Sequence, residues 1–307
     1  MDAFDQTMMP FDVLRNVAQA IQFNSTDYIL ATIDSAMRYF EKRRIAQGKK
    51  AHASNYFHTL ERLHSFIADN GKAPFSIFAE KGNSKLPSFV AFSSLPGVTC
   101  PGAGSCLDYC YSFKAWRTPM AFGRQAMNAY ILRFKPQLIV DSLDALMLKK
   151  KFSDGFTLRL YVDGDFSSVS DFALWQSILA ERPTIAAYGY SKSFNEILAY
   201  AKSGASFSNN YVLNVSGGHN HNENTVKQIE ALPITRGSFV AVPVAHKVRS
   251  IEHGDPEHRK QVQSATKAAH NVKTAFACPG QCNTCTSRGH ACGSMKFKGI
   301  TIGIAVH

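Results

Sequence analysis

The sequence predicts an α/β protein in which short parallel strands alternate with helices behind an N-terminal helical segment. Apolar residues keep helical spacing over residues 10–70, and β-rich runs alternate with helical stretches from residue 87 onward. Strand–helix repeats of this kind form parallel sheets. Six predicted strands suggest a partial (β/α)6 barrel related to the TIM barrel, and an open doubly wound sheet is the alternative.

The first predicted part, residues 1–72, is a helical segment. Phe11, Leu14 and Val17 keep the spacing of one helix face. Residues 25–27, Ser-Thr-Asp, have the composition of an N-cap and predict the start of a second helix.

The second predicted part, residues 73–307, carries the strand–helix repeats and two cysteine-rich loops. A connector rich in Gly, Pro, Lys and Asn at residues 71–85 marks the change of pattern. The predicted strands are 88–92, 156–162, 185–190, 211–215, 239–243 and 300–306. The predicted helices are 119–150, broken before Pro136, and 170–181, 194–203, 223–231 and 257–270.

Composition narrows the class of protein. The 307 residues are 45% hydrophobic, as in a globular chain rather than a disordered one. Residues 1–5 lack the basic start of a secretory signal, and no apolar run approaches the ~18 residues of a membrane helix. We therefore expect a cytoplasmic protein with no membrane partner. The net charge of +11 suits contact with nucleic acid, although basic tracts also serve as solvated faces.

All seven cysteines fall in two short loops. A reducing cytoplasm disfavours disulfides, and an odd number of thiols cannot all pair within one chain, so the clustering indicates metal. Thiolates select zinc or iron–sulfur clusters. Only one pair has the C-x2-C spacing of a zinc knuckle, which favours one or two [4Fe-4S] clusters, with zinc as the alternative. The predicted ligands are Cys100, Cys106 and Cys110 in the first loop and Cys278, Cys282, Cys285 and Cys292 in the second.

The first cysteine loop supplies three thiols where a [4Fe-4S] cube has four irons. One interpretation leaves the fourth iron open to a substrate or cofactor. The other closes the site with a ligand from the second loop, such as Cys292 or His290.

Polar residues follow the predicted strands, at the edge where parallel folds place their chemistry. Asp163 and Asp165 suit acid–base roles, although Asp-Gly is also a common turn. Two histidines in a Gly/Asn loop suit a metal or a phosphate, although a solvated loop is the plainer interpretation. The predicted catalytic residues are Asp163, Asp165 and Lys192, and the predicted cofactor-binding residues are Tyr109, Tyr111, Ser191, His219 and His221.

A cluster loop after the first strand of a partial barrel, with Tyr109 directly before its last cysteine, resembles the radical S-adenosylmethionine (SAM) enzymes. The resemblance implies SAM as a cofactor. The first loop reads C-x5-C-x3-C, whereas that family usually has C-x3-C-x2-C, a spacing found here at residues 278–285. Residues 163–166, Asp-Gly-Asp-Phe, stand where the family commonly carries Gly-Gly-Glu-Pro.

A resemblance over about residues 80–295 is to the phage and plasmid family called gene product 88. Its features here are residues 83–89, 100–102, Cys106, 109–111, 163–166, Trp175, Pro183, 190–193 and the second cysteine loop. This resemblance implies a mobile-element origin and a cysteine-bound metal site.

The sequence thus predicts an iron–sulfur protein of a phage or plasmid, acting as a redox or radical-SAM-like enzyme with its cluster at the C-terminal rim of the barrel. The substrate, small or macromolecular, is not specified by these residues. The alternative is a nucleic-acid-binding or regulatory protein in which an iron–sulfur cluster or zinc is structural or redox-sensing.

Overall fold

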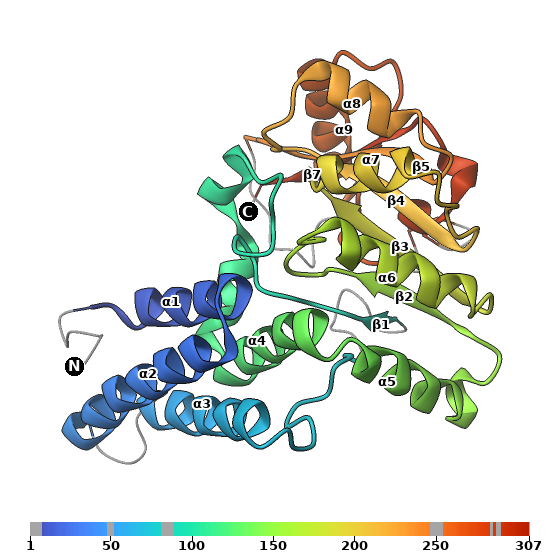
Figure 1. Cartoon of the computed structure of the whole chain (residues 1–307). Coiled ribbons are helices and arrows are strands. Elements are labelled where there is room, and N and C mark those ends of the chain that lie inside the picture. Colours follow the sequence, from blue (N-terminus) through green and yellow to red (C-terminus); the bar gives the residue numbers. More distant parts are fainter. Residues whose placement is uncertain are drawn as a thin grey trace. The chain divides into compact units, whose positions relative to one another are not determined.

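The chain contains two compact units that interleave along the sequence (Figure 1). The computed structural model describes residues 8–47, 52–80, 89–245, 254–282, 285–286 and 290–306. The first unit comprises Met1–Ile77, Ser93–Thr99 and Tyr111–Ser142, and the second comprises Phe78–Phe92, Cys100–Cys110 and Leu143–His307. The division predicted at residues 72 and 73 stays a prediction, because compactness does not show which part folds by itself.

The first unit is helical, as residues 10–70 predict. It contains α1 (Pro10–Phe23), α2 (Thr26–Gln47), α3 (His52–Ala68), the 3-10 helix η2 (Tyr111–Arg117) and α4 (Pro119–Phe134). Proline begins both α1 and α4, where its missing N–H costs no hydrogen bond. Val13, Val17 and Ile21 form the fully buried stripe of α1.

In the residues that the structure describes, the second unit is built on a parallel sheet of seven strands. They are β1 (Val90–Ala91), β2 (Phe156–Leu160), β3 (Ile185–Ser191), β4 (Tyr211–Ser216), β5 (Thr235–Val242), β6 (Ala275–Ala277) and β7 (Thr301–Ala305). Their order in the sheet is β1-β2-β3-β4-β5-β7-β6, and every neighbouring pair is parallel. The predicted α/β class with a parallel sheet is confirmed.

Helices connect the strands close to the predicted positions. They are α5 (Gln137–Met147), α6 (Val169–Ala180), α7 (Phe194–Lys202), α8 (Glu223–Glu230) and α9 (Pro256–His270). Ser168, Asn222 and Asp255 cap α6, α8 and α9, each accepting a hydrogen bond from a backbone N–H of the first turn. None of the described helices is long and apolar enough to span a bilayer.

The described part of the chain contains seven strands, one more than the six predicted. The missed strand, β6, has three residues, too few to show an alternating pattern. In addition, β5 begins at Thr235 rather than at residue 239. The prediction missed this start because Arg236, a charged residue, is fully buried in the strand. Of the predicted strand 88–92, residue 88 lies outside the described residues.

The two faces of the sheet pack against different parts of the chain. Val262 of α9 packs with Val240, Val242, Ala277 and Ala305 on one face. Because successive strand residues point to opposite faces, other side chains of β5, β6 and β7 form the second face, together with side chains of β3 and β4. These are Tyr188, Val212 and Ile302, with Tyr190, Phe239 and Phe276 beside them, and they pack against the second cysteine loop.

Candidate functional site

The second cysteine loop begins at the carboxyl end of β6. Cys278 follows β6 directly, and its N–H donates to the carbonyl of Gly303 in β7 (2.8 Å). Cys292 is buried in the cluster on the second face of the sheet, and Cys278, Cys282 and Cys285 pack against that same cluster. The fold therefore gathers four thiols from 15 residues of sequence over one surface.

Each of these thiols has a hydrogen-bond donor from the loop or the sheet. The donors are the Gly280 amide for Cys278, the Ala291 amide for Cys285 (3.3 Å), the Tyr188 hydroxyl for Cys282 (3.9 Å) and the Tyr190 hydroxyl for Cys292. Hydrogen bonds to sulfur of this kind orient metal-bound thiolates and spread their charge.

Burial makes these thiols reluctant to ionise by themselves. Burial raises the pKa of Cys278 to about 11, and the neighbouring Cys282 and Cys285 raise it as well. Burial also raises the pKa of Cys292 to about 12, with Cys278 adding to the effect. A metal bound here must therefore displace protons, so its affinity falls as the pH falls.

The donor set fits a thiolate-bound metal or cluster. Four soft ligands with matching hydrogen-bond donors share one partly dry surface, which is the ligand chemistry of zinc and iron–sulfur sites. Across the described ranges, no three His, Cys, Asp or Glu side chains already stand close enough to hold a metal ion. The four cysteines are grouped by their packing against the same buried cluster, and by the effect that neighbouring thiols have on the pKa of Cys278 and Cys292.

His290 has a capping role in this loop. Its Nδ1 accepts a hydrogen bond from the Gly293 N–H (3.1 Å), and its ring lies 4.8 Å from Phe89 and 4.6 Å from Tyr188. Burial and the charge of Arg159 lower its pKa to about 4, so the imidazole is neutral at pH 7. With Nδ1 accepting, the proton of the neutral ring belongs on Nε2, which leaves neither nitrogen free as a ligand.

A buried arginine lies beside the thiols. Arg236, in β5, is 0% exposed, and its Nε donates to Oδ1 of Asn214 (2.7 Å). Asn214 in turn donates to the carbonyl of Cys292 (2.9 Å). A second arginine, Arg159, stacks on the ring of Tyr190 at 4.9 Å, and its charge lowers the pKa of Cys278 against the larger effect of burial.

The first cysteine loop is fixed to the turn that follows β4. The amides of Gly104 and Cys106 both donate to the carbonyl of Gly218 (3.1 Å each), and the Asn220 amide donates to the carbonyl of Gly102 (3.2 Å). This close approach requires glycine at two positions. A Cβ on Gly102 would stand 1.7 Å from the Lys192 carbonyl oxygen, and Gly218 has φ +75°.

The docked loop lies beside the polar residues that follow β2, β3 and β4. The Asp165 carboxylate accepts from the Ser191 hydroxyl (2.7 Å), the Lys192 amide (2.6 Å) and the Phe166 amide (2.8 Å). Burial raises the pKa of Asp165, and these hydrogen bonds oppose that rise. Asp165 therefore ties the loop after β2 to the loop after β3.

Lys192 and the two histidines link that network to the turn after β4. The Lys192 Nζ donates to the Ser216 hydroxyl (2.8 Å), and Nε2 of His221 lies 2.7 Å from the Lys192 carbonyl oxygen. His219 and His221 both contact the ring of Phe194. Burial, followed by the charges of His221 and Lys192, lowers the pKa of His219.

The family model for gene product 88 matches residues 58–297, which include both cysteine loops and the strands β1 to β6 but not β7.

The chain belongs to the gene product 88 family. This confirms the family resemblance drawn from the sequence. No curated protein and no solved structure matches the chain. The resemblance to radical SAM enzymes stays a prediction.

The remaining predicted residues of this gene product 88 protein are less enclosed. Tyr109 is 41% exposed. Its partial burial raises the pKa of its hydroxyl, and the charge of Cys106 raises it further. Asp163 is half-buried between two residues in left-handed conformation, Tyr161 (φ 51°) and Gly164 (φ 79°). Tyr111 is 53% exposed and belongs to the first unit, whereas the other predicted residues belong to the second.

Three parts of the site were missed from the sequence. Arg236 and Arg159 are single arginines within strands, and a charged residue inside a β-rich run is the signal that identifies such positions. Tyr161 is a bulky residue with positive φ, a conformation that costs ~1–3 kcal/mol and concentrates at functional sites. Local sequence gives no sign of that conformation.

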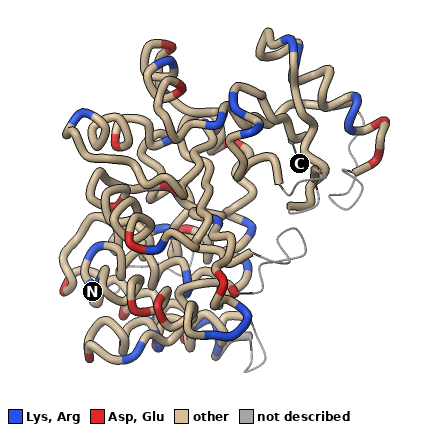
Figure 2. Tube along the Cα trace, turned by 90° about the vertical axis from the view of Figure 1, so that its right-hand side faces the viewer, with Lys and Arg blue, Asp and Glu red and all other residues tan. Residues whose placement is uncertain are grey.

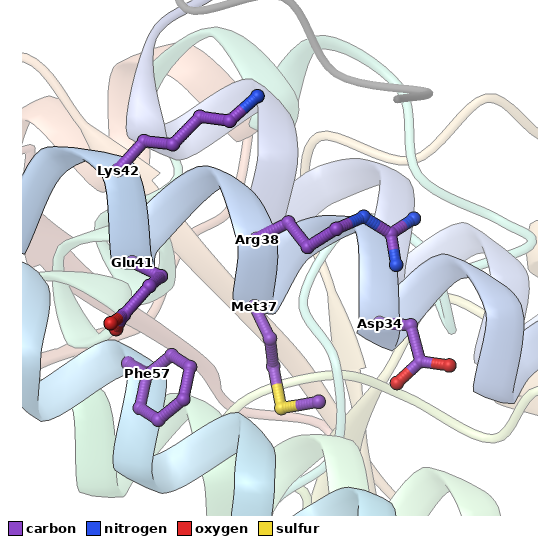
Figure 3. A pocket seen from close by; sticks show the side chains of 6 residues that line it. All are labelled: Asp34, Met37, Arg38, Glu41, Lys42 and Phe57. Atoms are coloured by element: carbon purple, nitrogen blue, oxygen red, sulfur yellow. The ribbon is translucent and has the colours of Figure 1, made fainter. Parts of the chain in front are cut away.

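A separate hollow lies on the helical unit and contains none of the predicted site residues. Figure 3 shows its lining, which comes from α2 and Phe57 of α3 around a cavity of about 310 Å³. Two nearby arginines have local partners: Arg44 pairs with Glu41, and Arg43 donates to the Tyr39 hydroxyl and the Met8 carbonyl. Figure 2 shows Lys and Arg spread along the trace and interspersed with Asp and Glu.

Proposed function

We propose that this gene product 88 protein is an iron–sulfur protein that holds a [4Fe-4S] cluster on Cys278, Cys282, Cys285 and Cys292. The observation that carries the proposal is the gathering of these four thiols on one face of the sheet, each with a hydrogen-bond donor. When bound, such a cluster supplies one-electron chemistry. Zinc on the same ligands is the alternative.

The first cysteine loop serves a second role in this proposal. Cys100, Cys106 and Cys110 hold a cluster with one iron open to a substrate or to SAM, and the protein acts as a redox or radical-SAM-like enzyme. Support comes from the docking of this loop beside the loops after β3 and β4. In this proposal the sheet forms the predicted partial barrel, and the cluster of the first cysteine loop lies at the C-terminal rim of that barrel.

The polar residues of the rim have distinct roles in the proposed enzyme. Asp165 holds the loops after β2 and β3 in place, while Lys192 and His219 face the bound ligand. Asp163 is the acid–base group, at the carboxyl end of β2, where parallel folds place their chemistry.

Nucleic-acid binding in the cytoplasm of a phage- or plasmid-bearing cell is the second candidate function. The net charge of +11 favours it. The local partners of Arg43 and Arg44 in α2 count against a phosphate-binding helix face at those two residues.

The deciding experiment is anaerobic purification with quantitation of iron, sulfide and zinc. About four irons per chain indicate one cluster and about eight indicate two. Cys285→Ser is expected to remove the cluster of the second loop, and Cys106→Ser that of the first, so the pair of variants assigns each cluster to a loop. A folded wild-type protein that carries zinc alone, or no metal after reconstitution with iron and sulfide, overturns the iron–sulfur proposal.

Two further measurements separate the proposed enzyme from the second candidate. A change in the EPR spectrum of the reduced protein on adding SAM supports an open iron at the first loop, whereas an unchanged spectrum contradicts it. Binding to DNA or RNA that weakens steeply with salt supports the second candidate.

A further inference from the structure

Arg236 is a buried cation whose hydrogen-bond acceptors are all neutral. In addition to Asn214, the acceptors within the described residues are the backbone carbonyls of Gly237 (3.2 Å), Ser238 (3.0 Å), Phe297 (3.5 Å) and Ile300. Its side chain is 0% exposed. These acceptors satisfy the guanidinium N–H groups, but they do not neutralise its charge.

A buried charge without a counter-charge is costly, and side chains of this kind are normally paired. Arg182 shows the usual solution in the same unit. It is also buried, and its guanidinium forms a two-pronged ion pair with the Asp144 carboxylate (2.8 and 2.9 Å). Both arginines are buried, Arg236 at 0% and Arg182 at 8% exposure, but Arg182 has a carboxylate partner where Arg236 has neutral acceptors.

The thiol cluster lies where the counter-charge of Arg236 is needed. Asn214 accepts from Arg236 and donates to the carbonyl of Cys292, so one side chain joins the arginine to the cysteine loop. Arg236 and Cys292 also interact electrostatically. A divalent metal ion or an oxidised [4Fe-4S] core on four thiolates leaves an assembly with net negative charge.

We propose that Arg236 is the counter-cation of the metal–thiolate centre on the second cysteine loop, a positioning residue that helps to retain the centre and favours its more reduced state. This inference rests on the proposed function of that loop. A fixed positive charge stabilises the added electron of a reduced cluster, as buried charges and hydrogen bonds tune cluster potentials in general.

The test compares three variants of the full-length protein, reconstituted anaerobically with iron and sulfide. Arg236→Gln removes the charge, Arg236→Lys keeps it with fewer hydrogen bonds, and Arg182→Gln is the matched control, a buried arginine with its own carboxylate. Iron and sulfide per chain are measured first. The midpoint potential is then measured by titration with dithionite as the electron donor.

Arg236→Gln is expected to lower the ratio of reduced to oxidised cluster at least tenfold at a fixed potential, which is about 59 mV for one electron. Arg236→Lys recovers most of that shift, and Arg182→Gln lowers the melting temperature without changing the potential. A loaded, folded Arg236→Gln protein with the wild-type potential overturns the inference. Equal shifts in Arg236→Gln and Arg182→Gln also overturn it.

If Arg236→Gln does not fold, Arg236→Lys becomes the test of the inference. A midpoint potential close to that of the wild type supports it, and a large shift of the potential despite the retained charge contradicts it. A wild-type protein that binds only zinc refutes the iron–sulfur proposal, and competition with a chelator then tests Arg236 separately. In that case, a tenfold loss of zinc affinity in Arg236→Gln supports the counter-cation role, and unchanged affinity overturns it.

Discussion

Asp171 is a buried carboxyl that holds the turn after β2. It accepts hydrogen bonds from the Tyr161 hydroxyl (2.6 Å) and from the Ser167 amide (2.9 Å). Burial raises its pKa from the ordinary value of 3.8 to about 6. Through Tyr161, this carboxyl supports the left-handed residue that precedes Asp163 and Asp165.

The raised pKa of Asp171 predicts a pH dependence of stability. The native state binds the proton more tightly than the unfolded chain, so this group stabilises the fold fully below pH 3.8. Its contribution is lost as the pH rises to about 6, by up to ~3 kcal/mol in the free energy of unfolding. Asp171→Asn removes this part of the slope. Urea titrations of both proteins between pH 4 and 7 check it, and identical slopes contradict it.

At the scale of single residues, the cysteines could be predicted from the sequence as ligands, whereas the role of Arg236 could not. Spacing alone singled out the seven thiols, because cysteines rarely cluster without a reason. The role of Arg236 depends on Asn214, which lies on the neighbouring strand 22 residues earlier in the chain. A pairing between strands of that kind is set by the register of the sheet, which the sequence does not reveal.

At the scale of elements, the docking of the first cysteine loop depends on glycine. Gly102→Ala places a methyl group against the Lys192 carbonyl, a backbone atom that cannot move aside alone. We expect a loss of ~1–3 kcal/mol in the free energy of unfolding from the resulting overpacking. Chemical denaturation measures it.

The control for this prediction is Gly71→Ala. A Cβ at Gly71 meets no atom within 4 Å, so the same change of residue type should alter stability by less than ~0.5 kcal/mol. Equal effects at Gly71 and Gly102 would show that backbone entropy, rather than the close contact, sets the cost.

Helices were easier to predict than strands because their signals are local. Ser168, Asn222 and Asp255 mark the starts of α6, α8 and α9 within one turn of sequence. By contrast, β6 has three residues and is a strand only because β7 pairs with it. The sequence order of the strands also held only through β5, since β7 lies between β5 and β6.

For the whole molecule, metal bound by the clustered cysteines is expected to raise the free energy of unfolding. Metal that binds the native state alone adds about 2.7 kcal/mol at a free concentration one hundred times its dissociation constant. Removal of the metal with a chelator is therefore expected to lower the melting temperature of the wild-type protein. Circular dichroism checks this, with the double variant Cys106→Ser, Cys285→Ser, which lacks a ligand in each cysteine loop, as the protein that should not respond. A wild-type melting temperature that chelation leaves unchanged contradicts a stabilising centre.

The connection from β6 to β7 suggests how the protein folds. Neighbouring parallel strands are usually joined by an α-helix, which is ordered by its own hydrogen bonds. Here the described residues of the connection form two short 3-10 turns, η5 (Ala291–Gly293) and η6 (Met295–Phe297), together with the second cysteine loop. We expect such a connection to gain order only once β7 has entered the sheet, after the transition state for folding. A ligand held by its thiols would then slow unfolding while leaving the folding rate unchanged.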